Sequence, residues 1–412
     1  MATILTTSHK LHAEQQGQRR RQRQALLLVL PLLAFILVAF AAPIASMLYR
    51  SVYNPALSTL IPKTAEALSQ WDGQSLPDAA TRASFASELQ ALAQTRQAGT
   101  LATAINRHYP GATSTINQSA RFLRQKSDAQ PPEVAAQWLM DSHADWEKVE
   151  LWRAMRIGSQ KYTSNNFLTA LDLERTPKGE LQARSSARIY VPLFVKTFGI
   201  ALSITLICAL LGYPLAFYMA QAKERTANLL LLLILLPFLT SLLVRTTAWI
   251  ALLQTEGLIN NLLLWLGWIQ APLELLYTRF STIIAMTHIL LPFMVLPLYS
   301  VMRGINPDYA QAALSLGSHP LGAFCKVYFP LSRPGLQAGA LLVFIISIGY
   351  YITPALVGGT DGQLIANLIA FHMQQSGNWG LAAALGSLLL FVVLLLYWIY
   401  DRLVGSGQAQ LV

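Results

Sequence analysis

Long stretches without a charged residue constrain this chain more than any other feature of its sequence. Charge-free runs occur at Ala25–Tyr49, Thr197–Ala222, Phe280–Met302, Pro334–Thr360 and Gly362–Tyr400, and the stretch Thr226–Thr255 is interrupted only by Arg245. A helix needs about 20 apolar residues to cross the hydrocarbon core of a bilayer. We therefore predict an all-α membrane protein whose six transmembrane helices lie near residues 25–48, 192–221, 228–252, 280–300, 336–356 and 380–400.

The first apolar run follows a basic stretch, so a cleavable signal peptide is the alternative to a membrane anchor. The apolar region of a signal peptide has about 7–15 residues, and Ala25–Tyr49 is longer, which favours a retained anchor. Six spans place both termini on one side of the membrane, together with Lys10, Arg19, Arg20, Arg21, Arg23, Lys223, Arg225, Arg303, Lys326, Arg333 and Arg402. The opposite side has only Arg279 in its short loops. The positive-inside rule therefore predicts that both termini are cytoplasmic.

A polar region of ordinary composition interrupts this apolar chain, because 13 of the 20 acidic residues lie between residues 51 and 188. Long loops are translocated regardless of their charge, so we predict an external domain there. The predicted organisation is a basic cytoplasmic arm (1–24), a transmembrane helix (25–49), a periplasmic insertion (50–188), a transmembrane domain (189–403) and a cytoplasmic tail (404–412). Apolar spacing predicts mostly helix in the insertion, for example at 79–98 and 133–155, whereas 114–118 and 163–166 resemble turns.

The sequence lacks the residues that several classes of function require. The two cysteines, Cys208 and Cys325, and seven histidines show no metal-ligand spacing, and the sequence has no nucleotide-binding or hydrolase motif. Asp141, His143 and Asp145 cluster in sequence, but solvated positions on a helix explain them better than a site. The net charge of +10 comes largely from membrane-flanking arginines, not from a basic face for nucleic acid. We therefore predict neither an enzyme nor a nucleic-acid-binding protein, and any ATP must bind another subunit.

The strongest motif lies between the fourth and fifth predicted spans. It begins Gln311-Ala312-Ala313, continues after three residues with Gly317, and ends nine residues later with Val327-Tyr328-Phe329-Pro330. Gly317 permits a turn between two short helices, and His319-Pro320 suits the start of the second. The small residues at 312–313 allow another protein to approach closely. The alternative is an amphipathic helix on the lipid headgroups, although such helices usually carry more Lys and Arg than this segment does.

This motif resembles the EAA loop of ABC-importer permeases, whose pattern is EAA, three residues, Gly, nine residues and I-x-L-P. Ala312, Ala313, Gly317 and Pro330 match, whereas Gln311, Val327 and Phe329 replace Glu, Ile and Leu. The resemblance implies that the loop at 301–335 forms coupling helices that dock into a separate ATPase. It also implies that ATP and magnesium bind that ATPase and that this chain has no cofactor. The loss of the carboxylate at Gln311 removes one charged contact.

Further segments resemble the spermidine/putrescine-type subfamily of these permeases. They are LVRTTAW (243–249), GLIN (257–260), LPFMVLPLYS (291–300), FPLSRPGLQAG (329–339) and YYITPALVGG (350–359). The resemblance covers about 189–403 and implies a type I ABC importer permease in the bacterial inner membrane. The implied partners are two ATP-binding subunits, a second homologous permease and a periplasmic solute-binding protein. The implied solute is a small amine-bearing metabolite, with polyamines first and ω-amino acids such as 4-aminobutyrate next. The insertion is longer than this subfamily usually carries.

Candidate residues for the pathway or its gate are Arg245, Trp249, Tyr350, Tyr351, Thr353 and Asp361. Arg245 is an ionisable group within a span, which indicates function, or else a structural pair with Glu256 or Asp361. The segment 350–354 breaks the fifth span, and exposed carbonyls or aromatic faces there suit a cation. An interfacial aromatic belt explains the same tyrosines equally well. His288 is better explained as a packed, hydrogen-bonded side chain, and Asp361 as a solvated turn residue.

Two other classes of function remain as alternatives. A stand-alone secondary transporter needs intramembrane carboxylates or two related halves, and the predicted spans contain no internal Asp or Glu. A membrane-anchored receptor would act through the insertion and would not need the loop at 301–335.

Overall fold

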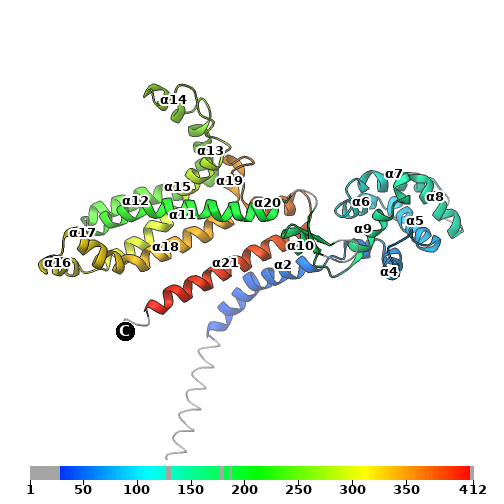
Figure 1. Ribbon diagram of the computed structural model, residues 1–412, viewed down its shortest axis with the longest axis horizontal. Coiled ribbons are helices and arrows are strands. Elements are labelled where there is room, and N and C mark those ends of the chain that lie inside the picture. Colours follow the sequence, from blue (N-terminus) through cyan, green and yellow to red (C-terminus); the bar gives the residue numbers. More distant parts are fainter. Residues whose placement is uncertain (1–27, 127–130, 176–180, 185–187, 409–412) are drawn as a thin grey trace, which may run out of the picture. The chain divides into compact units, whose positions relative to one another are not determined.

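The computed structural model describes residues 28–126, 131–175, 181–184 and 188–408, with side chains up to Arg402, and it divides into two compact units at Ser164/Asn165 (Figure 1). The predictions for the arm at 1–24 and for the last residues of the tail lie outside this range. The regular secondary structure of the described residues is helical apart from one two-stranded hairpin and one isolated β-bridge, Tyr53–Tyr162. The predicted all-α membrane class is therefore confirmed.

The first unit combines an apolar helix with a helical module. The apolar helix is described from Leu28 to Val52 and ends in η1 (Leu37–Ala41) and α2 (Ala42–Val52). The module that follows contains α3 (Ala56–Leu60), α4 (Pro62–Gln70), α5 (Ala79–Gln94), α6 (Ala98–Asn106), α7 (Ala112–Arg124), α8 (Pro132–Ser142), η2 (Ala144–Glu147) and α9 (Val149–Ser159).

The module has its own aromatic core. Phe85, Trp146 and Trp152 are fully buried, and their ring centroids lie 5.0–5.7 Å apart. The indole nitrogen of Trp146 donates to Ser119 Oγ at 2.8 Å, so the buried ring keeps its hydrogen bond. A core of this kind lets the module fold without a disulfide, and the prediction that the insertion is mostly helical is confirmed.

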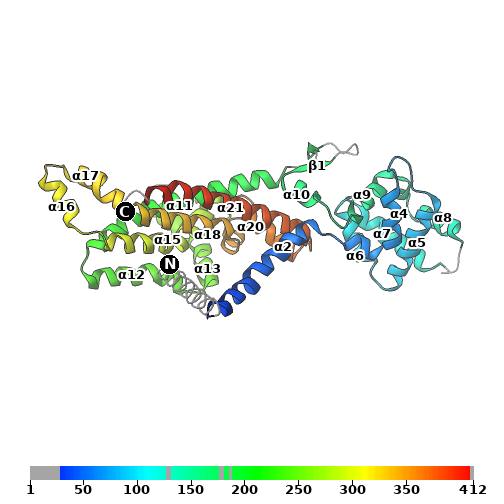
Figure 2. The same ribbon diagram turned by 90° about the horizontal axis from the view of Figure 1, so that it is seen from below.

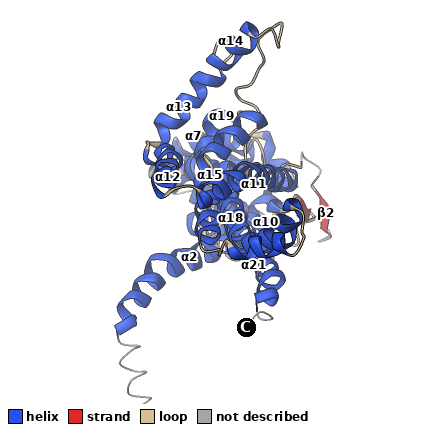
Figure 3. Cartoon of the chain, turned by 90° about the vertical axis from the view of Figure 1, so that its left-hand side faces the viewer, coloured by secondary structure: helices blue, strands red, loops and turns tan. Residues whose placement is uncertain are grey.

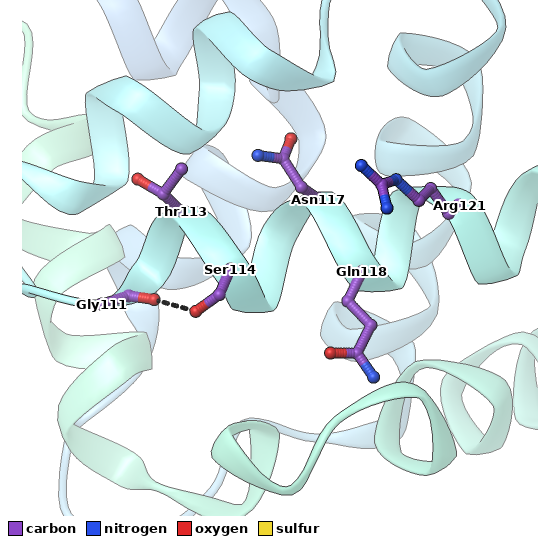
Figure 4. A pocket seen from close by; sticks show the side chains of 6 residues that line it. All are labelled: Gly111, Thr113, Ser114, Asn117, Gln118 and Arg121. Carbon is purple, nitrogen blue, oxygen red and sulfur yellow. Dashed lines mark hydrogen bonds between the residues drawn. The ribbon is translucent and has the colours of Figure 1, made fainter.

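The turn predicted at Ser114–Gln118 is wrong, because these residues lie in the middle of α7. Figure 4 shows that this helix presents a polar face with Thr113, Ser114, Asn117, Gln118 and Arg121 around a shallow hollow. Its opposite face buries Thr115, Ile116, Ser119, Ala120 and Leu123 in the module. The polar residues form one side of an amphipathic helix. The turn was predicted because several of them are close together in the sequence.

The cluster at Asp141, His143 and Asp145 organises the turn between α8 and α9. Asp145 accepts hydrogen bonds from Thr115 Oγ1 at 2.8 Å and from Lys148 Nζ at 2.6 Å, and the Lys148 bond is the main cause of the lowered pKa of Asp145. His143 Nδ1 accepts from the Asp145 backbone N–H. Within the described ranges, no group of three or more His, Cys, Asp or Glu residues could hold a metal ion.

The second unit contains the remaining helices and the hairpin. Its elements are α10 (Asn165–Ala170), β1 (Leu173–Arg175), β2 (Leu181–Ala183), α11 (Tyr190–Gln221), α12 (Glu224–Leu239), α13 (Leu242–Leu253), α14 (Leu258–Trp265), α15 (Arg279–Arg303), α16 (Asp308–Ser315), α17 (Pro320–Ala323), η3 (Phe324–Tyr328), α18 (Phe329–Gly349), α19 (Ile352–Val357), α20 (Ile365–Gln374) and α21 (Trp379–Gln408).

The second compact unit begins at Asn165, so α10, β1 and β2, which the sequence assigns to the insertion, pack with the second unit. The periplasmic insertion at 50–188 stays a prediction. Ala170 is buried with Tyr190 and Leu381. The strands β1 and β2 pair antiparallel. Asp172, which is 3% exposed, accepts hydrogen bonds from the backbone N–H groups of residues 189, 190 and 191. This carboxylate caps the first turn of α11, where orphan N–H groups and the helix dipole favour a negative charge.

Helices α11, α15 and α18 lie side by side and form the centre of the bundle (Figures 1 and 2). Gly335 and Gly339 form a GxxxG pair on α18 that faces α15. A Cβ at Gly339 would lie 2.9 Å from Met294 O, and a Cβ at Gly212 on α11 would lie 3.0 Å from Met294 Cγ. Small residues at these points let the helix backbones approach closely.

Two predicted spans differ from the structure. The third, predicted at 228–252, is broken at Thr240–Ser241, where both residues have extended ψ angles, and α13 leaves at 94° to α12. Figure 3 shows α13 and α14 projecting from the bundle. The fifth, predicted at 336–356, is instead a continuous helix from Pro320 to Gly349. Hydropathy averaged over a window records that residues are apolar but not where the backbone turns.

Candidate functional site

The motif around Gly317 forms a helix–turn–helix at the end of the bundle. Helix α16 ends in a Schellman turn, in which Ser318 N donates to Ala313 O and Gly317 N donates to Leu314 O, both at 3.0 Å. Gly317 has φ +90°, the left-handed conformation that side chains other than glycine disfavour. The predicted turn between two helices is confirmed.

The second helix of the motif starts as predicted, but it continues without a break into α18. His319 Nδ1 accepts from Leu321 N at 3.4 Å, and Pro320 is the first helical residue. From there α17, η3 and α18 run without a break to Gly349. The second half of the loop predicted at 301–335 is therefore the first part of a continuous helix, and Val327 and Pro330 lie on that helix.

The motif presents an open surface. No residue of α16 is buried, Gln311 and Ala312 are exposed, and Ala313 is half-buried. The large apolar side chains Leu314, Leu316 and Leu321 are 44%, 88% and 69% exposed. Apolar side chains on a helix that the bundle does not cover mark an interaction surface.

A hollow of about 620 Å³ lies between this motif and the ends of α11 and α15. Gln311 and Leu314 of α16 line it, together with Phe217 and Arg303 at the helix ends. The aromatic residues of α11 at this end, Tyr213 and Phe217, were not among the sequence candidates, because within a long apolar run nothing distinguishes them from lipid-facing residues.

Arg245 stabilises the break between α12 and α13. The side chain is 9% exposed, and its Nη2 donates to Phe238 O at 3.3 Å and to Thr240 O at 2.9 Å. These carbonyls belong to the end of α12, where the helix leaves acceptors unpaired. The pairing that the sequence offered, with Glu256 or Asp361, is not among the ion pairs of the described residues. The Nε of Arg245 is buried and has no hydrogen-bond partner among the described residues.

Trp249 and His288 contact each other across α13 and α15. The indole Nε1 donates to His288 Nδ1 at 3.2 Å, so the hydrogen of a neutral imidazole is on Nε2. The structure therefore packs and hydrogen-bonds His288, in agreement with the interpretation drawn from the sequence.

The break after the fifth span lies at Tyr350 and Tyr351, between α18 and α19. Tyr350 is half-buried against the bundle core, and Tyr351 is 39% exposed. The Tyr351 carbonyl accepts from Asn367 Nδ2 at 2.7 Å, which occupies one of its two acceptor positions. Thr353 is fully buried, and its hydroxyl has no hydrogen-bond partner in the part of the chain that the structure describes.

Asp361 forms an ion pair with Arg279 at 2.8 Å, and both side chains are about half-exposed. Its backbone carbonyl accepts from Lys196 Nζ at 2.9 Å. The residue is thus partly solvated, as a turn residue would be, but it also joins α11 and α15 to the segment before α20. The other candidates lie on or beside two helices, α13 and α19, which contact α15 and each other. Arg245 and Trp249 are on α13, and Tyr350, Tyr351 and Thr353 are on or next to α19.

The helical bundle is that of a multi-pass membrane protein, and its sequence shows which class of membrane protein it is. The family model for the inner-membrane component of binding-protein-dependent transport systems matches residues 212–406. The chain belongs to this family, which makes it a multi-pass inner-membrane permease of an ABC importer.

Several individual proteins of this family are similar in sequence to the chain. The chain is 37% identical over 202 residues to the spermidine/putrescine transport system permease protein PotB of Salmonella typhimurium. This alignment covers 49% of this chain and 70% of PotB. It is 30% identical to the inner membrane ABC transporter permease protein YdcU of Escherichia coli, over 53% of this chain and 74% of YdcU. A crystal structure of a bacterial ABC transporter that imports alginate aligns with a TM-score of 0.39 at 17% identity, over 53% of this chain and 86% of that chain.

Proposed function

We propose that this chain forms half of the translocation pathway of an ABC importer for a small amine-bearing solute, with polyamines as the first candidates. The observation that carries the proposal is the motif at 311–330, in which a glycine-terminated helix projects from the bundle with its apolar side chains uncovered. Such a helix suits a groove on an ATP-binding subunit. ATP-driven closure of the two ATPases would then move the helices of the bundle as rigid bodies.

The solute assignment rests on similarity to the relatives named for spermidine and putrescine transport. An ω-amino acid such as 4-aminobutyrate is the next candidate. A fixed cation lining the pathway would repel a polyamine. Arg245 is compatible with a polyamine because its guanidinium is buried and directed at the carbonyls of Phe238 and Thr240.

The proposed assembly contains this chain, a second homologous permease, two ATP-binding subunits and a periplasmic binding protein. The ATPases would bind ATP and magnesium, and this chain would bind no cofactor and perform no catalysis. We further propose that both termini are cytoplasmic, which places the motif at 311–330 on the side of the ATPases and the helical module on the side of the binding protein.

The proposal is tested by purifying the tagged chain from its native membrane and identifying the proteins that accompany it. We expect an ATPase and a second permease. The complex is then reconstituted with the binding protein, and ATP-dependent uptake of labelled putrescine, spermidine and 4-aminobutyrate is compared. Purification of the chain alone would refute the importer assignment. Uptake of 4-aminobutyrate but not of either polyamine would refute only the solute.

A further inference from the structure

The motif that projects from the bundle contacts it through very few side chains. We define the coupling segment as α16, α17 and η3, residues 308–328. In this segment Ala323 is the single buried residue. The hollow of about 620 Å³ separates α16 from the ends of α11 and α15. Movement of α16 can reach α18 along the continuous helix Pro320–Gly349, whereas it reaches α11 through the rings at the base of the segment.

Those rings form an aromatic cluster with α11, which we define as Tyr213, Phe217, Phe324, Tyr328 and Phe329. Phe217 of α11 meets Phe324 at 5.7 Å and Tyr328 at 5.0 Å between centroids, with interplanar angles of 89° and 90°. These are edge-to-face contacts, the arrangement that aromatic pairs prefer. Phe324 and Tyr328 also stack on each other at 6.0 Å, so Phe217 packs against a pair of rings that contact each other.

Tyr213, one turn before Phe217, ties the same end of α11 to the fifth span. Its hydroxyl is hydrogen-bonded to Ser332 Oγ at 2.7 Å, and its ring lies 5.8 Å from Phe329 and 6.1 Å from Phe324. Ser332 is fully buried. The cluster therefore joins the coupling segment to α11 and α18 at one point.

The backbone at this point departs from a regular α-helix. Residues 324–328 form the π-helical turn η3 between α17 and α18, and both Phe324 and Tyr328 are on it. π-helical turns inside α-helices occur frequently at functional sites. Here the turn holds the two rings that receive Phe217.

We propose that Phe217 is the positioning residue that transmits movement of the coupling segment to α11, through its contacts with Phe324 and Tyr328. The inference rests on the proposed function. It adds that docking of the ATPase and transmission of its movement depend on different residues. The exposed face of α16 docks the ATPase, and the aromatic cluster transmits.

The test compares three variants in the full complex. Phe217→Leu keeps an apolar side chain and removes both edge-to-face contacts, and Phe217→Tyr keeps the ring. Phe198→Leu is the matched control, because Phe198 is also on α11 and stacks on Phe344 of α18 at 6.3 Å. Its position is 19 residues, or about 28 Å, from Phe217 along the helix.

Two quantities are measured for each variant: the amount of ATPase that co-purifies, and the putrescine or spermidine taken up per ATP hydrolysed. We expect Phe217→Leu to retain the ATPase but to transport about fivefold less per ATP, since each aromatic pair contributes a factor of roughly 2 to 13. Phe217→Tyr and Phe198→Leu should keep the wild-type ratio. A wild-type ratio in Phe217→Leu would overturn the proposal, and so would loss of the ATPase from that variant, because the cluster would then only hold the loop together.

A second measurement does not depend on the solute. A bimane label on Gly199→Cys, in a Cys325→Ser background, reports on α11 far from Phe217, at a position where a Cβ would meet nothing within 4 Å. Vanadate trapping with ATP should change its fluorescence in the otherwise wild-type complex and not in Phe217→Leu. Equal changes in both would overturn the transmission role. If the wild type itself recruits no ATPase, the proposed function fails, which is a distinct result.

Discussion

Replacing Gly317 by alanine tests whether the turn of the motif determines ATPase binding. A Cβ at this position would meet nothing within 4 Å, so steric contact contributes nothing and only the φ of +90° matters. The left-handed conformation costs a non-glycine residue about 1–2 kcal/mol. If the ATPase binds only the turn seen here, the apparent affinity falls by up to about 5- to 30-fold.

The assay is titration of the purified permease with its ATP-binding subunit, and the matched control is Gly304→Ala in the same loop. Gly304 has φ −83°, and a Cβ there would lie 3.5 Å from its nearest neighbour, so this change should leave the affinity unaltered. Gly317→Asn should bind better than Gly317→Ala, because asparagine tolerates the left-handed region. Equal affinities for Gly317→Ala and Gly304→Ala, or an Asn variant weaker than the Ala variant, would refute the reasoning.

Three further predictions concern stability. Gly339→Leu should destabilise the bundle by about 1–3 kcal/mol, because its side chain would meet the α15 backbone. Gly199→Leu, where a Cβ meets nothing within 4 Å, should not destabilise it. Thermal unfolding in detergent compares the two variants. Removing the exposed Arg279–Asp361 ion pair should change stability by less than about 1 kcal/mol, as a double-mutant cycle would measure. Burial lowers the pKa of His108 below 6.5, so the unfolded chain binds more protons than the native one as the pH falls below about 6.5. The stability of the helical module should therefore decrease as the pH falls below about 6.5, and it should decrease less in His108→Gln. Thermal melting measured between about pH 5 and 8 checks this.

The membrane spans show which structural features can be predicted from local sequence and which cannot. The fourth span, predicted at 280–300, is helical from Arg279 to Arg303, because charged residues at both ends limit the apolar run. The break in the third span was not predicted. Its hydropathy is continuous, but α12 alone has 16 residues and reaches about 24 Å, short of the roughly 30 Å core. Arg245 signals the break only when its carbonyl partners are known.

The turn of the motif at 311–330 could be predicted from local sequence, whereas the contacts of the pathway residues could not. Gly317 and His319-Pro320 specify a turn through backbone geometry and capping, which depend on neighbours in sequence. The arrangement of Trp249 with His288, or of Thr353 in the core, depends on residues from other helices. The sequence could identify these side chains as unusual in a membrane helix but could not assign their partners.

Local sequence predicts the membrane class, the apolar segments and the turn of the motif at 311–330, because hydropathy and turn chemistry act over a few to about twenty residues. The contacts that join the motif to the bundle depend on the packing of distant helices. Tyr213 and Ser332 are 119 residues apart and meet only because α11 and α18 pack together. Asp172 likewise caps α11 only once the hairpin has folded beside it. Such pairings depend on how helices pack, and packing is a property of the whole bundle.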